Sequence, residues 1–255
     1  MTHPATLLKN SWRAYGRDFR AWLILTSPLI VLSALWIIFA LMSNGEPILT
    51  PLSSLPLRIA VIAGILVAVA AVILVARVFT TAVIVSAYRS LNGQKPNINE
   101  AIKVGWRTFW PVLWVAILRD LVVLGGLILL IVPGIIWGLR YSLAVQAAAI
   151  EGKRGMDALH RSKDLTRGKL FETFVNFGVI GAILGYGAWI IIIAAAAVFL
   201  VLGEMVALVV PASAASAVAA VVAIIVAVAE VAVIWLIKPL SPLAVTSIYK
   251  DYSDK

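Results

Sequence analysis

The chain has 255 residues, of which 62% are hydrophobic and 13% charged, and its formal net charge is +9. Soluble domains contain about 45–50% apolar residues, and the mean hydropathy of +1.03 lies far outside that class. These values exclude a single water-soluble globular domain and predict an all-α integral membrane protein. The absence of cysteine excludes disulfides, thiol catalysis and cysteine-ligated metals.

The first predicted element is an amphipathic surface helix over residues 4–20. Leu8, Trp12, Tyr15 and Phe19 recur at helical spacing and predict its apolar face. Its basic residues are Lys9, Arg13, Arg17 and Arg20. A basic amphipathic helix beside a membrane span is typical of contact with anionic lipid headgroups.

Six apolar segments follow. A helix needs about 20 mostly apolar residues to cross about 30 Å of hydrocarbon, and each segment is compared with that length. They are residues 21–42, 57–88, 108–131, 134–150, 171–200 and 218–238. The prediction is one transmembrane domain over residues 1–255, a bundle of six membrane-spanning helices. Pro133 and Gly134 predict a tight hairpin between the third and fourth spans. Five or seven crossings are the alternatives, because an apolar connector around Pro211 blurs the last boundaries.

Two further amphipathic surface helices are predicted between spans, over residues 97–107 and 155–169. The apolar positions of the first are Ile98, Ile102, Trp106 and Phe109, and those of the second are Ala158, Leu159, Ser162 and Leu165. Their basic residues are Lys103, Arg107, Arg161, Lys163, Arg167 and Lys169. Alignment of Ser11, Gly105 and Ser162 predicts a threefold internal repeat of one surface helix and one hairpin.

The distribution of charge predicts the orientation of the chain. Basic residues near the ends of spans stay cytoplasmic, and the three surface helices carry most of them. The alternate connectors are nearly free of charge: residues 43–56 hold only Glu46, and residues 202–217 hold only Glu204. Both termini are therefore expected in the cytoplasm.

Six charged residues of the apolar segments are singled out, because a charge at a helix centre costs about 2.5–3.5 kcal/mol if it faces lipid. They are Arg77, Arg119, Asp120, Arg140, Glu230 and Lys238. Arg119 and Asp120 are neighbours that point about 100° apart on a helix, so different partners are expected for them. Asp120 and Glu230 are each expected within ion-pair reach of Arg77, Arg119 or Arg140. Structural pairing, an ion or substrate path, and contact with another subunit are the three interpretations.

No catalytic arrangement is found in the sequence. The only histidines are His3 and His160. Asp157 and Asp164 lie on the same helical face as His160, which would suit a catalytic triad or half of a metal site. With no second histidine nearby and no specially placed serine, an ordinary surface helix with local ion pairs is the favoured interpretation. No glycine-rich phosphate loop or zinc-binding spacing occurs. We therefore expect a protein that is not an enzyme, with no catalytic residue, metal ligand or cofactor.

One run of residues resembles the signature of a bacterial family of membrane proteins. It consists of Pro133, Gly134, Arg140, Tyr141, Glu151, Gly152, Ala158, Ser162, Leu165 and Gly168. The family includes YciC-like proteins and the membrane domain fused to some glycerophosphodiester phosphodiesterases. The resemblance implies a multi-pass protein of the bacterial cytoplasmic (inner) membrane, in a family whose molecular function is mostly unassigned. The phosphodiesterase activity belongs to a separate soluble barrel that is not expected here.

The expected function is that of a non-enzymatic accessory, assembly or scaffold component. Its basic helices would contact anionic lipid headgroups, a larger membrane protein complex, or both. The alternative is a transporter or lipid-handling protein with a polar path through Asp120 and Glu230. Nucleic acid is not an expected partner, since the chain has no room for a soluble module with base-stacking aromatics.

Overall fold

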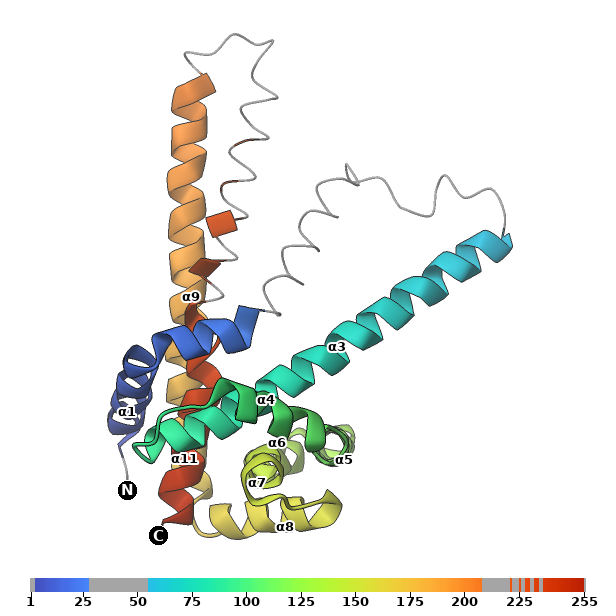
Figure 1. The fold of residues 1–255 in the computed structure, drawn as a ribbon, viewed down its shortest axis with the longest axis vertical. Coiled ribbons are helices and arrows are strands. Elements are labelled where there is room, and N and C mark those ends of the chain that lie inside the picture. Colours follow the sequence, from blue (N-terminus) through green and yellow to red (C-terminus); the bar gives the residue numbers. More distant parts are fainter. Residues whose placement is uncertain are drawn as a thin grey trace. The chain divides into compact units, whose positions relative to one another are not determined.

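The structure is a computed structural model that describes residues 3–27, 55–207, 221, 225, 228–229, 232–233 and 236–254. This part of the chain is helical and contains no strand. Its helices are α1 (Pro4–Arg17), α3 (Leu55–Leu91), α4 (Ile98–Arg107), α5 (Phe109–Leu129), α6 (Ile131–Arg140), α7 (Ala144–Glu151), α8 (Gly155–Thr166), α9 (Leu170–Ala207) and α11 (Leu240–Ser253) (Figure 1). Residues 19–27 are also helical. Most of the predicted first span and much of the predicted sixth lie outside the described residues.

Three helices are long and apolar enough to cross a membrane. The qualifying stretches are Leu74–Leu91 in α3, Phe109–Leu129 in α5 and Leu170–Gly187 in α9. Large apolar side chains stand exposed along them, such as Leu121 on α5 and Ile183 on α9, which are 58% and 52% exposed. This pattern is expected where hydrocarbon replaces water as the solvent, because burial against protein is then not required.

Backbone contacts divide the chain into two compact units. The first comprises Met1–Thr26, Val75–Leu184 and Lys238–Lys255, and the second comprises Ser27–Leu74 and Gly185–Ile237. Every buried apolar side chain of the described residues belongs to the first unit. One cluster there joins α5, α7, α8 and α11, and another joins Tyr15 and Trp22 to α3, α4 and α11. In the second unit, described side chains such as Trp189 are exposed.

Helices α5 and α6 form an antiparallel hairpin with a turn at one residue, Leu130, whose backbone is extended. The sequence placed this turn at Pro133 and Gly134, which instead lie in the first turns of α6. Proline is tolerated there because the first backbone N–H groups of a helix have no partner within it. Gly134 permits the close approach, since a Cβ on it would lie 2.6 Å from the Leu127 side chain.

The predicted fourth span over residues 134–150 is not one continuous helix. Helix α6 ends at Arg140, a turn covers residues 141–143, and α7 begins at Ala144. Side chains of α8 satisfy the break: the Ser162 hydroxyl accepts from the Leu143 N–H (3.1 Å) and donates to the Arg140 carbonyl (2.8 Å). The Thr166 hydroxyl donates to the same carbonyl. Hydropathy could not show this break, because partners distant in sequence satisfy its backbone groups.

The apolar face predicted for α1 is wrong by about one position. Its buried residues are Leu7, Ser11, Ala14 and Tyr15, whereas Trp12 is 63% exposed. The reason is close packing: Ser11 is buried, and its hydroxyl lies 3.3 Å from that of Ser247 on α11.

In α4 a small residue is likewise buried in place of a predicted aromatic one. The predicted face of α8, by contrast, is correct. In α4, Gly105 is buried and a Cβ on it would lie 2.7 Å from the Val78 carbonyl oxygen, while Trp106 is 60% exposed. In α8 all four predicted residues are buried, namely Ala158, Leu159, Ser162 and Leu165.

Candidate membrane-interface surface

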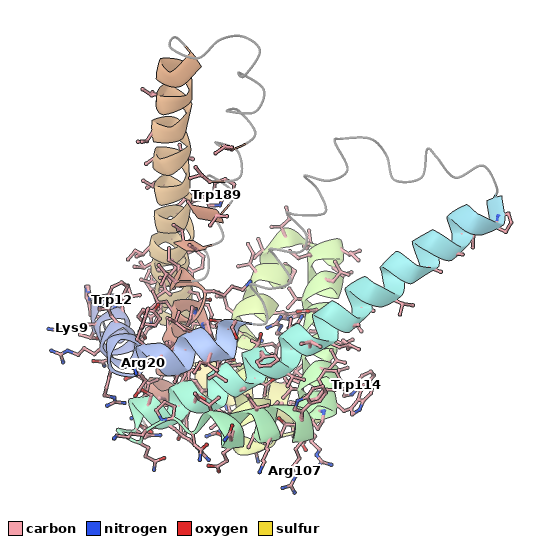
Figure 2. The ribbon with its side chains drawn as sticks, turned by 45° about the horizontal axis from the view of Figure 1, so that its top comes forward. Lys9, Trp12, Arg20, Arg107, Trp114 and Trp189 are labelled. Carbon is pink, nitrogen blue, oxygen red and sulfur yellow. The ribbon has the colours of Figure 1, made fainter. Side chains whose placement is uncertain are left out.

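Seven cations stand on the solvent-exposed sides of the amphipathic helices and their continuations. We call this set the basic surface: Lys9, Arg13, Arg20, Lys103, Arg107, Lys163 and Arg167. Figure 2 shows the Lys9 and Arg107 side chains extending away from α1 and α4. The opposite sides of these helices are buried, so the basic groups are held outward by packing of the helices themselves.

Four tryptophans of the same compact unit are also exposed. Trp12, Trp106, Trp110 and Trp114 are between 56% and 73% exposed. Figure 2 shows Trp12 and Trp114 projecting from α1 and α5. Tryptophan is enriched at the headgroup level of membranes because it combines an apolar ring with a hydrogen-bond donor. Exposed tryptophan beside exposed lysine and arginine is the chemical pattern of an interfacial surface.

Three cations that the sequence assigned to this surface instead contact other helices. Arg17 donates to the carbonyl and the hydroxyl of Ser90 at the end of α3. Lys169 lies with its Nζ 4.6 Å from the centre of the Tyr252 ring, in a cation–π contact. Arg161 donates to Glu151 of α7 through its Nε, at 2.9 Å. These three are positioned to join helices rather than to meet lipid.

Arg161 belongs to a cluster of three side chains from α7, α8 and α11. Its partner Glu151 also accepts a hydrogen bond from the Tyr249 hydroxyl. Tyr249 is only 1% exposed, and burial raises the pKa of its hydroxyl, with the hydrogen bond to Glu151 acting in the same direction. Sequence analysis missed Tyr249 as a partner, because 98 residues separate it from Glu151 and no local pattern links them.

A second ion pair joins α3 to α4. Two nitrogens of Arg89 donate to the two oxygens of Glu100, at 2.7 and 2.6 Å. The hydrogen bonds from Arg89 hold the pKa of the Glu100 carboxyl below its usual value. The side chains are 28% and 50% exposed, so solvent screens much of the attraction.

A half-open cleft of about 450 Å³ lies between α1, the end of α3 and α11. Its cations are Arg13, Arg17 and Lys250, and its acids are Asp251 and Asp254. The Lys250 ammonium already donates to the Leu91 carbonyl at 2.8 Å. Because the cleft contains both cations and acids, and Lys250 is already hydrogen-bonded, we interpret it as a polar contact between helices and not as a binding site for an anion or a cation.

One expectation for the charges within the apolar segments is confirmed and another is wrong: Asp120 lies within ion-pair reach of Arg119, at 2.6 Å. Arg119 donates to its neighbour Asp120 through two nitrogens, at 2.9 and 2.6 Å, so the expectation of different partners is wrong. The two side chains leave the helix in directions that differ by one residue step, but the arginine side chain is long enough to reach Asp120. Arg77 and Arg140 are half-buried and Lys238 is exposed. Glu230, and with it the expected pairing of that acid, lies outside the described residues.

The histidines occupy ordinary positions. The His3 Nδ1 accepts from the Ala5 N–H at 3.3 Å and caps the start of α1, and His160 is exposed. Within the described residues, no three His, Asp or Glu side chains are grouped as they would be to hold a metal ion.

Comparison of the chain with protein-family models, with curated proteins and with solved structures finds no match.

Proposed function

We propose that this protein is a non-enzymatic multi-pass membrane protein whose amphipathic helices bind anionic lipid headgroups. The observation that carries the proposal is the basic surface, seven exposed cations on helices whose other faces are buried, together with four exposed tryptophans. Each lysine or arginine near an anionic leaflet contributes about 1 kcal/mol, so even part of this set binds strongly. Three helices long enough to cross a membrane bring the surface to the bilayer.

The proposal includes the topology. We place six spans in the bacterial cytoplasmic membrane with both termini in the cytoplasm, built from three units of one surface helix and one hairpin. Support comes from the aligned residues Ser11, Gly105 and Ser162, which are all buried where their helices pack most closely on a neighbour. The resemblance to the YciC-like family agrees with this arrangement and rests on the signature residues alone.

A role as an accessory or scaffold component for a larger membrane complex uses the same surface. The transporter alternative has less support, because Arg119 neutralises Asp120 and the Asp120 side chain is 57% exposed rather than enclosed by the bundle. A polar path would need an enclosed carboxylate that is free to exchange a cation.

Lipid retention tests the proposal. The full-length protein, extracted from nanodiscs that contain phosphatidylglycerol and phosphatidylcholine, is examined by native mass spectrometry. We expect preferential retention of phosphatidylglycerol, and we expect Lys103→Gln with Arg107→Gln to reduce it severalfold. The matched control is Lys153→Gln with Arg154→Gln, which removes the same charge from the exposed turn before α8. Equal retention of both lipids by the unmodified protein contradicts the proposal.

A further inference from the structure

An open cleft of about 540 Å³ lies where the chain bends after α1 and meets the segment that precedes α4. Helix α1 ends at Arg17, the backbone turns at Asp18, and residues 19–27 are helical again (Figure 1). The facing wall consists of Lys95, Pro96 and Ile98. Both walls belong to the first compact unit, so the cleft is formed within that unit.

Three hydrogen-bonded side chains hold the bend against the end of α3. Arg17 donates to the carbonyl oxygen and to the hydroxyl of Ser90, at 2.5 and 2.8 Å. The Ser90 hydroxyl in turn donates to the Asp18 carboxylate at 2.7 Å, and the Arg17 Nε donates to the same carboxylate at 3.3 Å. Arg17 and Asp18 therefore neutralise each other and are already engaged within the protein.

The two remaining cations of the cleft are Arg20 and Lys95. Both are exposed, and neither has a hydrogen bond or an ion pair with any residue that the structure describes. Figure 2 shows Arg20 at the bend after α1. Because Arg17 and Asp18 cancel, these two side chains leave the cleft with two uncompensated positive charges. The ligand of matching charge is one group that carries two negative charges.

The apolar side chains of the cleft indicate that this group belongs to a lipid. Phe19 and Ile24 line the cleft and are 37% and 52% exposed. Ile24 follows Arg20 by four residues, about 6 Å along the helix at 1.5 Å per residue, so the two side chains share a face. Ile24 also lies within the first predicted membrane span, residues 21–42. The cation at the beginning of the span and the apolar side chain further along it match the order of headgroup and acyl chain.

We propose that this cleft binds the phosphomonoester headgroup of phosphatidic acid. The inference rests on the proposed function, since Arg20 belongs to the basic surface, and it names the lipid class for one part of that surface. A phosphate monoester has a second pKa of about 6 and carries about 1.5–2 negative charges at pH 7, whereas the phosphodiester of phosphatidylglycerol carries a single charge. The Arg20 guanidinium donates to two phosphate oxygens and the Lys95 ammonium to the third, as charge-assisted hydrogen bonds. Phe19 and Ile24 contact the first carbons of the acyl chains.

Equilibrium binding of tritium-labelled dioleoyl phosphatidic acid to the full-length protein in detergent tests the inference, with dioleoyl phosphatidylglycerol as the comparison lipid. We expect the unmodified protein to bind phosphatidic acid about tenfold more tightly, which corresponds to about 1.4 kcal/mol. Arg20→Gln with Lys95→Gln is expected to abolish this preference. The melting temperature of that variant should stay nearly unchanged, because both side chains are exposed and unpaired among the described residues.

Gly16→Leu tests the cleft without a change of charge. Gly16 lines the cleft, and a Cβ built on it would have no atom within 4 Å. Leucine also favours a helix more than glycine does, so this variant should fold. Its side chain should occupy the cleft and weaken phosphatidic acid binding severalfold. The matched control for charge is Lys153→Gln with Arg154→Gln, two exposed cations outside the cleft, which should bind phosphatidic acid as the unmodified protein does.

Equal binding of the two lipids by the unmodified protein overturns the inference, and so does an undiminished preference in Arg20→Gln with Lys95→Gln. Unchanged binding in Gly16→Leu also overturns it, because the ligand would then lie outside the cleft. Competition by glycerol 3-phosphate as strong as that by phosphatidic acid would show that the ligand is a soluble phosphomonoester and not a lipid. Retention of phosphatidylglycerol without a preference for phosphatidic acid refutes this inference alone, whereas failure to retain either anionic lipid refutes the proposed function as well.

Discussion

Helices α4 and α8 perform the same structural task with opposite arrangements of charge. Each is amphipathic, follows an apolar helix and is tied to it by one arginine–glutamate pair. In α4 the glutamate, Glu100, belongs to the surface helix and Arg89 to the preceding helix. In α8 the arginine, Arg161, belongs to the surface helix and Glu151 to the preceding one.

Because the arginine and the glutamate are exchanged between the two ion pairs, the two helices differ in which cations remain exposed. In α4 both cations, Lys103 and Arg107, remain on the exposed side, because the tie uses an acid of that helix. In α8 the tie uses Arg161, which is held further through Glu151 by the buried Tyr249. Under the proposed function, lipid contact therefore falls mainly to α4 and α1, and Arg161 of α8 joins helices.

The largest expected effect comes from the closest contact of α4. Gly105→Ala should lower stability by about 3 kcal/mol, because its Cβ would lie 2.7 Å from the Val78 carbonyl oxygen and the backbone must shift. Thermal unfolding in detergent, followed by tryptophan fluorescence, measures it. Gly125→Ala is the control: Gly125 lies within α5 with no atom near its added Cβ, and alanine favours a helix. A loss no larger than in the control would show that α4 is not packed closely on α3.

The next effect distinguishes the two ion pairs. Glu151→Leu should cost about 2 kcal/mol, since it leaves the buried Tyr249 hydroxyl without its partner. Glu100→Leu should change the melting temperature little, because the Arg89–Glu100 pair is exposed to solvent. The same unfolding experiment compares the two variants. Equal losses would contradict the different roles assigned to α4 and α8.

A smaller effect should appear in the pH dependence of stability. Burial raises the pKa of Tyr249 above its usual value of about 10, so its contribution is complete below pH about 10. It is lost as the pH rises towards the raised pKa, because the unfolded chain releases the proton first. Tyr249→Phe should therefore lower stability at neutral pH and flatten the alkaline decline. Tyr15 and Tyr252, whose pKa values burial also raises, contribute to the residual slope in that variant.

At acid pH, the expected pH dependence of stability comes from the Arg89–Glu100 pair that joins α3 to α4. Hydrogen bonds from Arg89 lower the pKa of Glu100, so the contribution of that carboxylate is lost as the pH falls below its usual range. Its exposure makes this acid effect small. Melting profiles of Glu100→Gln and Tyr249→Phe measured across pH separate the two ends, and an unchanged alkaline slope in Tyr249→Phe would contradict the assignment.

The sequence predicted the class of fold and the positions of the amphipathic helices, because hydropathy and helical periodicity are local properties. It predicted the buried face of α8 but misplaced that of α1, since close packing at Ser11 outweighs the size of Trp12. The break between α6 and α7 depends on Ser162, which lies about twenty residues away, and no local pattern reports it. Pairing of Glu151 with Tyr249 is equally non-local.

The sequence predicted that the amphipathic helices carry a basic surface, but not which of their cations belong to it. Exposed cations such as Lys103 follow from helical periodicity, whereas Arg17, Arg161 and Lys169 have the same spacing and turn towards other helices. The difference depends on contact groups supplied by other helices, namely Ser90, Glu151 and the Tyr252 ring.

The most direct test measures both lipid retention and thermal stability in two variants, one that removes the two cations of α4 and one that removes Arg161 of α8. We predict that Lys103→Gln with Arg107→Gln lowers retention of phosphatidylglycerol severalfold and leaves the melting temperature nearly unchanged. Arg161→Gln should lower the melting temperature and leave retention nearly unchanged, because Arg161 is occupied by Glu151. If Arg161→Gln reduces retention as strongly as the α4 variant does, the division between a lipid-binding α4 and a structural Arg161 is contradicted.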